Sequence, residues 1–326
     1  MFYFHQNKLL EYCTNLLIKD YTFAELSQFR LKFNSIMNNH QKKWLYLIIL
    51  SIVWGSSFIL MKKALLGVNP IQLGALRMLF AAIFMLIIGF PSLKKIQKKH
   101  YKFIVYTALS GTLFPVFLFA FALEYIDSAI ASILNSLTPF NTLLFGFWVF
   151  GIAFKRNQVI GILIGLVGTL VLILEGADLN PNQNYWYSLL IVIGSIGYAL
   201  NVNMVKKYLS DLDALAITTG NFLLLIIPAF IILFFTGFFS TFSGTEIELN
   251  ALIWIAVLAV FGTGLAKVLY NKMVHLSTPV FASSVTYLIP IVAIFWGVLD
   301  GERLSLVQLL AGAFILFGVY LVNRKK

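Results

Sequence analysis

The chain contains one pattern twice: five long apolar segments, the fourth interrupted by a proline, are followed by five more segments of the same build. A shift of 151 positions superposes the interrupting prolines, Pro139 and Pro290, and also a Gly-Thr pair, at 111–112 and 262–263. If each segment crosses a membrane once, the odd number of crossings inverts the second unit relative to the first. Inverted repeats of this kind are typical of secondary transporters.

The composition is that of an integral membrane protein. Of the 326 residues 60% are hydrophobic and 11% are charged, and the mean hydropathy of +0.88 exceeds what a soluble domain can bury. A bilayer core about 30 Å thick needs about 20 apolar residues per helix, and runs of that length favour helices over barrel strands. The ten expected helices span residues 44 to 62, 70 to 91, 102 to 123, 128 to 151, 157 to 175, 186 to 206, 213 to 236, 250 to 270, 279 to 299 and 304 to 322.

We therefore expect an all-α integral membrane protein with ten transmembrane helices arranged as two inverted five-helix repeats. Residues 41 to 178 form the first repeat and residues 179 to 326 the second, after an extension of residues 1 to 40. The extension is either an interfacial amphipathic helix, or it precedes a native start at Met37. Its lone Cys13 offers neither a disulfide framework nor a cysteine zinc site, and we expect no cofactor and no metal.

The net charge of +11 reflects membrane topology rather than a nucleic-acid partner. With the amino terminus in the cytoplasm, the inner loops and ends of the repeats hold 15 Lys and Arg residues and the outer loops hold only three, Lys62, Lys63 and Arg303. This bias follows the positive-inside rule. It predicts a multi-pass protein of the cytoplasmic (inner) membrane, with both termini cytoplasmic and the lipid bilayer as its surroundings.

Several motifs together resemble one transporter family. They are the run Trp54-Gly55-Ser56-Ser57-Phe58, a helix opening at Asn69 and Pro70 with Arg77 inside it, and GVLDGERLSLVQLLAGAFILFGVYLV from Gly297. The chain resembles an EamA-type transporter of the drug/metabolite transporter (DMT) superfamily. The resemblance implies an exporter-like carrier in which helices 1, 3, 4, 6, 8 and 9 surround a central cavity. One departure is that Glu302 has no acidic counterpart in the first repeat, so the two repeats are not expected to use it symmetrically.

The two interrupting prolines mark the candidate solute site. A proline within a helix frees the carbonyl four residues earlier, here those of Asn135 and Thr286, and such carbonyls can bind a solute at the middle of a membrane. The alternative is a kink needed only for helix packing. The predicted pathway residues are Trp54, Arg77, Asn135, Ser136, Pro139, Asn201, Thr286, Tyr287 and Pro290.

Charged side chains within the expected spans are few, and they are cationic. Arg77 either anchors its helix or faces the cavity, whereas Lys267 is predicted to reach lipid headgroups from the cytoplasmic end of its helix. A cation that faces the cavity would favour a solute with a carboxylate or phosphate. No acid or histidine is expected at depth, so exchange or gradient-driven movement is favoured over proton antiport, and the coupling candidates are Glu124 and Glu302 at the rim.

The predicted function is export of a small organic metabolite, which could be an amino acid, an organic anion or a drug-like solute. A passive pore or a non-transporting scaffold remains the alternative. An enzyme is not expected, because the spans lack the His, Cys, Asp and Glu residues that a catalytic or metal site needs. The small-residue face formed by Gly161, Gly165 and Gly168 predicts either close packing within the chain or a homodimer contact.

Overall fold

The computed structural model describes residues 38–151, 184–302 and 304–323, and ten positions between 160 and 175, namely 160, 161, 163–165, 167, 168, 171, 174 and 175. Parts of two predictions therefore lie outside the described residues: nearly all of the extension, and nine of the 19 residues of the segment at 157 to 175. The chain divides into the units Met1–Trp44 and Leu45–Lys326. The second unit contains the helical bundle, and the helix that leads into it begins at Asn39.

Eight helical stretches among the described residues are long and apolar enough to cross a bilayer. They are Asn39–Ala64, Pro70–Lys95, Lys98–Tyr125, Ser128–Phe150, Tyr185–Tyr208, Ala214–Phe235, Glu246–Leu276 and Pro279–Leu299. A further helix, α17 (Leu306–Asn323), contains the shorter apolar stretch Leu306–Gly318. The protein is therefore an all-α membrane protein, and these helices lie within a few residues of the expected spans.

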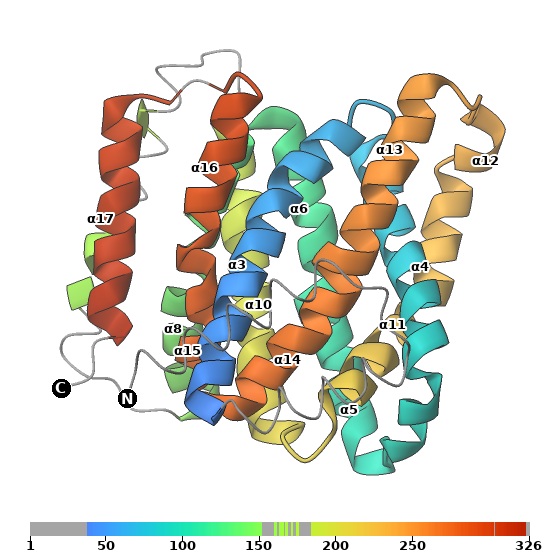
Figure 1. Ribbon diagram of the computed structural model, residues 1–326, viewed down its shortest axis with the longest axis horizontal. Coiled ribbons are helices and arrows are strands. Elements are labelled where there is room, and N and C mark those ends of the chain that lie inside the picture. The colour runs from blue at the N-terminus through green and yellow to red at the C-terminus, as the bar shows by residue number, and fades with distance from the viewer. Residues whose placement is uncertain are drawn as a thin grey trace, which may run out of the picture. The chain divides into compact units, whose positions relative to one another are not determined.

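Several of these stretches are composite, and their parts position the site. In chain order the elements of the first half are α3 (Asn39–Ala64), α4 (Pro70–Gly89), η1 (Phe90–Lys95), α5 (Lys98–Ala108), η2 (Leu109–Leu113), α6 (Phe114–Tyr125), α7 (Ser128–Asn135) and α8 (Thr138–Phe150). Those of the second half before α17 are η3 (Tyr185–Tyr187), α10 (Ser188–Tyr208), α11 (Ala214–Phe235), α12 (Phe238–Thr241), α13 (Glu246–Val257), η4 (Leu258–Leu265), α14 (Ala266–Leu276), α15 (Pro279–Ser283), η5 (Ser284–Tyr287) and α16 (Ile289–Leu299). Figure 1 shows α5 at the lower end of the bundle and the loop between α16 and α17 at the upper end.

Local chemistry explains where these elements begin and break. Asn69 forms a capping box with Gln72, so α4 starts at Pro70, where a proline needs no amide partner. The interruptions expected at the other two prolines are present: α8 opens with Pro139 in its first turn, and α16 opens with Pro290 in its first turn. Each proline therefore starts a new helix instead of kinking a continuous one.

The duplicated Gly-Thr pair has the same unusual backbone in both halves. Gly111 and Thr112 lie in the π-helical segment η2, and Gly262 and Thr263 lie in the π-helical segment η4. Insertions of this kind widen a helix by one residue and are frequent at functional sites. The repeat found in the sequence is therefore also a repeat of backbone geometry.

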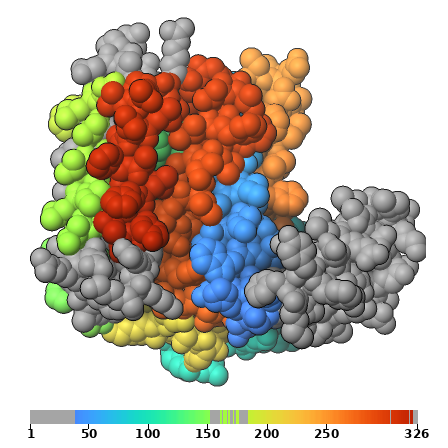
Figure 2. Space-filling view, turned by 60° about the vertical axis from the view of Figure 1, so that its left-hand side comes forward, coloured from blue at the N-terminus to red at the C-terminus, as the bar shows by residue number. Residues whose placement is uncertain are grey.

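Close packing joins the helices and leaves an apolar exterior. A Cβ placed on Gly55 of α3 would lie 3.0 Å from the Ile289 carbonyl oxygen of α16, so a glycine is needed where these helices touch. Figures 1 and 2 show α17, α16 and α3 side by side. Large apolar side chains remain exposed on the outside of the bundle, which suits contact with lipid. Examples are Ile52, Ile87, Ile227, Phe235, Phe295, Val298, Phe314 and Phe317.

The small-residue face of the fifth segment packs within the chain. A Cβ on Gly318 of α17 would lie 2.5 Å from the Gly161 carbonyl oxygen and 2.7 Å from the Gly165 nitrogen. A Cβ on Gly168 would lie 2.9 Å from the Ala311 carbonyl oxygen. This close approach supports the packing interpretation of that face over a dimer contact.

Candidate functional site

A cavity lies at the centre of the helical bundle and draws residues from both halves of the chain. The cavity has a volume of about 100 Å³. Its walls come from α3, α4, η2, α6, α7, α8, α10, η4, α14, η5 and α16. The lining residues are Trp54, Ser57, Phe58, Met61, Arg77, Gly111, Thr112, Val116, Phe119, Asn135, Thr138, Tyr198, Asn201, Gly262, Thr263, Lys267, Tyr270, Val285, Thr286 and Ile289.

Arg77 faces this cavity from the middle of α4. Arg77 is only 8% exposed, and its Nε donates a hydrogen bond of 2.7 Å to Thr263 Oγ1. Its Nη1 lies 3.2 Å from the Met61 sulfur. Both partners are neutral, so of the two interpretations of Arg77, the cavity-facing one fits its position.

Lys267 also faces the cavity, and the prediction that it reaches lipid headgroups is wrong. The residue is 8% exposed, and its Nζ donates to the Gly111 carbonyl oxygen at 2.6 Å and to Thr112 Oγ1. Position along the helix suggested an easy route to the membrane surface. The side chain turns inward because the wide π-turn of the opposite repeat offers it two oxygen acceptors.

The two cations cross between the repeats in a reciprocal pattern. Arg77 belongs to the first repeat and bonds to Thr263 of the second, whereas Lys267 belongs to the second repeat and bonds to Thr112 of the first. Trp54 crosses in the same way, since its Nε1 donates to the Gly262 carbonyl oxygen at 2.9 Å. The duplicated Gly-Thr pairs therefore hold polar groups from the opposite repeat. Sequence reasoning recognised the duplication but did not assign these pairs to the site.

The carbonyls that the prolines free are not vacant acceptors. The Asn135 carbonyl accepts a bond of 2.7 Å from the Thr138 hydroxyl, and the Thr286 carbonyl accepts one of 3.0 Å from the Ser136 hydroxyl. Asn135 and Thr286 line the cavity, as their candidate role requires. Their carbonyls are already hydrogen-bonded to neighbouring hydroxyls, and the second of these bonds ties the two broken helices together.

The other predicted pathway residues are divided between the cavity and its supports. Asn201 lines the cavity and donates through Nδ2 to the Thr107 carbonyl at 3.0 Å. Pro139 is buried at the start of α8, Tyr287 ends η5, and neither lines the cavity. Pro290 faces a separate apolar pocket beside α17.

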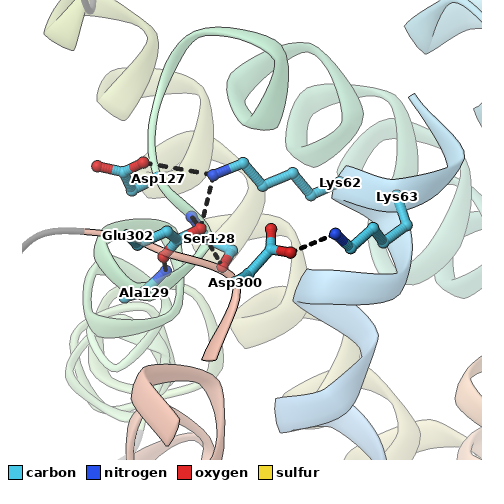
Figure 3. Close-up of polar contacts among 7 residues, drawn as sticks. All are labelled: Lys62, Lys63, Asp127, Ser128, Ala129, Asp300 and Glu302. Atoms are coloured by element: carbon cyan, nitrogen blue, oxygen red, sulfur yellow. Dashed lines mark hydrogen bonds and ion pairs between the residues drawn. The ribbon is translucent and has the colours of Figure 1, made fainter. Parts of the chain in front are cut away.

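Glu302, one of the two coupling candidates, is buried at one end of the helices in a network of hydrogen bonds (Figure 3). Its side chain is 2% exposed and lies 2.7 Å from Lys62 Nζ at the end of α3. It also accepts bonds from the Ser128 amide and hydroxyl at 3.0 and 2.7 Å and from the Ala129 amide at 3.1 Å. A carboxylate here accepts hydrogen bonds from the free amides in the first turn of α7. Its negative charge also interacts favourably with the positive end of the α7 helix dipole.

We call the group Lys62, Lys63, Asp127, Asp300 and Glu302 the ion-pair cluster. Lys62 lies 3.4 Å from Asp127, and Lys63 pairs with Asp300 (Figure 3). Gly301 has a φ of +87°, a conformation that glycine adopts easily and that folds Glu302 back toward α7. The cluster thus ties α3, the start of α7 and the loop after α16 together. Glu124, the other candidate, lies exposed near the end of α6 and does not line the cavity.

A second set of ion pairs lies at the opposite end, near the loop between α10 and α11. Asp211 lies 2.5 Å from Lys99 and 3.3 Å from His100, and Asp213 lies 3.3 Å from Lys95. Hydrogen bonds from Lys99 and then His100 lower the pKa of the Asp211 carboxyl to about 2. The two lysine pairs are well exposed, unlike Glu302, so they hold the loop to η1 and α5 only weakly.

Comparison with known proteins places this fold among transporters. The profile of the EamA-like transporter family matches residues 41–174 and 185–324. The uncharacterized inner membrane transporter YedA of Escherichia coli strain K12 is 27% identical over 286 residues, which cover 86% of this chain and 90% of YedA. The uncharacterized transporter YvbV of Bacillus subtilis is 26% identical over 86% of this chain and 91% of its own length. A crystal structure with 18% identity shares the fold at a TM-score of 0.60, over 86% of this chain and 95% of the other.

Proposed function

Because the chain belongs to the EamA-like transporter family of the DMT superfamily, we propose that it exports a small organic metabolite by alternating access around the central cavity. The chain is a multi-pass membrane transporter and not an enzyme. The observation that carries the proposal is the reciprocal crossing of Arg77 and Lys267 onto the Gly-Thr pairs of the opposite repeats. A site built jointly by both repeats can change its exposure when the repeats rock against each other.

The proposed topology has ten helices in two inverted repeats, residues 41 to 178 and 179 to 326, with both termini in the cytoplasm. The distribution of basic residues supports this orientation under the positive-inside rule. Lysines gather at the start of α5 and the end of α10, whereas Lys62 and Lys63 end α3 at the opposite side. In this orientation the ion-pair cluster lies on the outer side of the cavity.

The ion-pair cluster then acts as an outer gate. Opening the cavity outward requires α3 to separate from α7, which breaks the contact between Lys62 and Glu302. Because Glu302 is held by a lysine and three α7 donors, exchange or gradient-driven movement is favoured over proton antiport. Transport that collapses in Glu302→Gln at normal expression would reverse that preference.

Cysteine labelling tests the inverted topology. Cys13 is first replaced by serine, and single cysteines are then placed at Gln97 and Ser243, which are exposed in equivalent loops of the two halves. A reagent that cannot cross the membrane should label Ser243→Cys on intact cells and label Gln97→Cys only after permeabilisation. Labelling of both positions from one side would rule out the inversion.

Counterflow in proteoliposomes tests transport itself. A panel of metabolites is first screened for ligands that raise the melting temperature of the purified protein. The ligands found should then show saturable counterflow, in which internal solute accelerates uptake of labelled solute. Flux that never saturates indicates a pore, and the lack of any ligand or flux indicates a scaffold.

A further inference from the structure

We propose that the cavity selects organic anions, namely compact solutes with a carboxylate or phosphate head and an apolar body, over zwitterions and cations with the same body. The inference rests on the proposed function and specifies its substrate class. It distinguishes among amino acids, organic anions and drug-like solutes, which were all left open by the sequence.

The charge of the cavity is the first argument. Arg77 and Lys267 are both buried, and the partners of each are neutral oxygen or sulfur atoms. No Asp or Glu is among the described residues that line the cavity. A buried cation without an acid is costly, and an entering anion would offset that cost with charge-assisted hydrogen bonds.

The polar acceptors give the second argument. A solute ammonium needs a carboxylate or several free carbonyls, but four backbone carbonyls near the cavity already accept a bond. The donors to these carbonyls are Lys267, Trp54, Thr138 and Ser136. An α-ammonium would therefore enter a site that already contains two basic side chains and in which these four carbonyls are occupied, which disfavours amino acids and amines.

The aromatic side chains that line the cavity can pack against the apolar part of the solute. Trp54 lies against Tyr270 with ring centres 5.2 Å apart, and Phe119 lies 5.7 Å from Tyr198. Phe58 lies 6.0 Å from Phe119 on the same lining. Aromatic faces also attract cations, but the basic side chains of Arg77 and Lys267 in the same enclosed space oppose that attraction. The combination favours a hydrophobic body with an anionic head.

A matched series of ligands tests the inference on the native protein. 3-Phenylpropanoate, phenylalanine and phenethylamine carry the same ring with an anionic, zwitterionic or cationic head, and 2-phenylethyl phosphate replaces carboxylate by phosphate. Affinities are measured by ligand-induced thermal stabilisation at pH 6. We expect one of the two anions to bind at least about tenfold more tightly than phenylalanine, and phenethylamine to bind least. The two anions show which head group is preferred.

Variants locate the selectivity in the cavity. Arg77→Gln and Lys267→Gln should each weaken anion binding by about tenfold or more. They should also reduce the difference in affinity between the anions and phenethylamine. Lys207→Gln is the matched control, because it also removes one positive charge but lies outside the cavity. Lys207 is exposed at the end of α10, where it lies over the rings of Phe150 and Tyr208. Melting temperatures of the free variants show whether each one is folded.

Three results separate this inference from the proposed function. Equal or tighter binding of phenylalanine or phenethylamine overturns anion selectivity but leaves transport intact. Anion selectivity is equally overturned if no anion from a broad set of carboxylates and phosphates stabilises the protein. Failure of every stabilising ligand to show counterflow, in contrast, overturns the transport proposal and leaves the binding preference as measured.

Discussion

The cations of the ion-pair cluster and those of the central cavity differ in burial and, above all, in their partners. Lys62 and Lys63 contact carboxylates, whereas Arg77 and Lys267 contact only neutral atoms. A cation that is paired with an acid contributes to the structure and needs no further ligand. A buried cation without an acid is retained at a cost, and in a transporter a cost of this kind indicates a binding role.

The largest effect on stability is expected when the buried acid of the cluster is removed. Glu302→Ala leaves Lys62 without its closest partner and three α7 donors without an acceptor. The loss should be about 2–4 kcal/mol in the free energy of unfolding, measured by denaturation in detergent. Glu124→Ala is the control, since it removes an exposed carboxylate, and it should change the stability little. Equal losses in both variants would mean that the cluster does not hold the helices.

Adding an acid to the cavity should erase the difference between the two regions. Thr263→Asp places a carboxylate beside the Arg77 guanidinium, whose Nε now lies 2.7 Å from the threonine hydroxyl. Anion binding should weaken at least about tenfold relative to Thr263→Asn, which has the same shape without the charge. Titration with 3-phenylpropanoate and 2-phenylethyl phosphate measures this change in affinity. An unchanged affinity in Thr263→Asp would show that Arg77 does not contact the solute.

A smaller effect is expected at the exposed side of the cluster. The side chains of Lys63 and Asp300 are 42% and 22% exposed, so water screens this pair more than it screens Glu302. Lys63→Met should cost about 0–1 kcal/mol in unfolding free energy, and added salt should reduce the difference from the native protein. A loss as large as that of Glu302→Ala would contradict the distinction between buried and exposed pairs.

The smallest effect is expected for Asp211, at the other end of the helices. Its folded pKa of about 2 lies below the ordinary value of 3.8, so its stabilising contribution is complete above pH 3.8 and is lost as the pH falls toward 2. The melting temperature of Asp211→Asn should therefore lie slightly below that of the native protein by a constant amount from pH 5 to 8. That gap should shrink between pH 4 and 3, and a gap that widens there would contradict the assignment.

Features that depend on local chemistry were predictable from the sequence. Apolar length and the prolines predicted helices that begin at 70 and 128 and interruptions at Pro139 and Pro290, as the structure has them. Six of the lining helices followed from family resemblance and not from composition, whereas α4, which contributes Arg77 to the cavity, was not among them.

Features that depend on contact between the repeats were not predictable. Lys267 was judged by its distance from the helix end, but its position is set by acceptors on η2, which is about 155 residues away in the chain. Glu302 had no acidic counterpart in the sequence, and its capping role was not predicted. It caps α7 from the loop after α16, and such a contact cannot be read from one helix alone.

The most direct test compares the melting temperatures of Lys62→Met and Lys267→Met in the absence of ligand. Replacement of Lys62 leaves buried Glu302 without its cation, so the melting temperature should fall by several degrees. Replacement of Lys267 removes a buried charge that has no acid, so the melting temperature should stay the same or rise. If Lys267→Met is destabilised as much as Lys62→Met, the cavity lysine serves the fold, and the central claim that it is held for a solute is wrong.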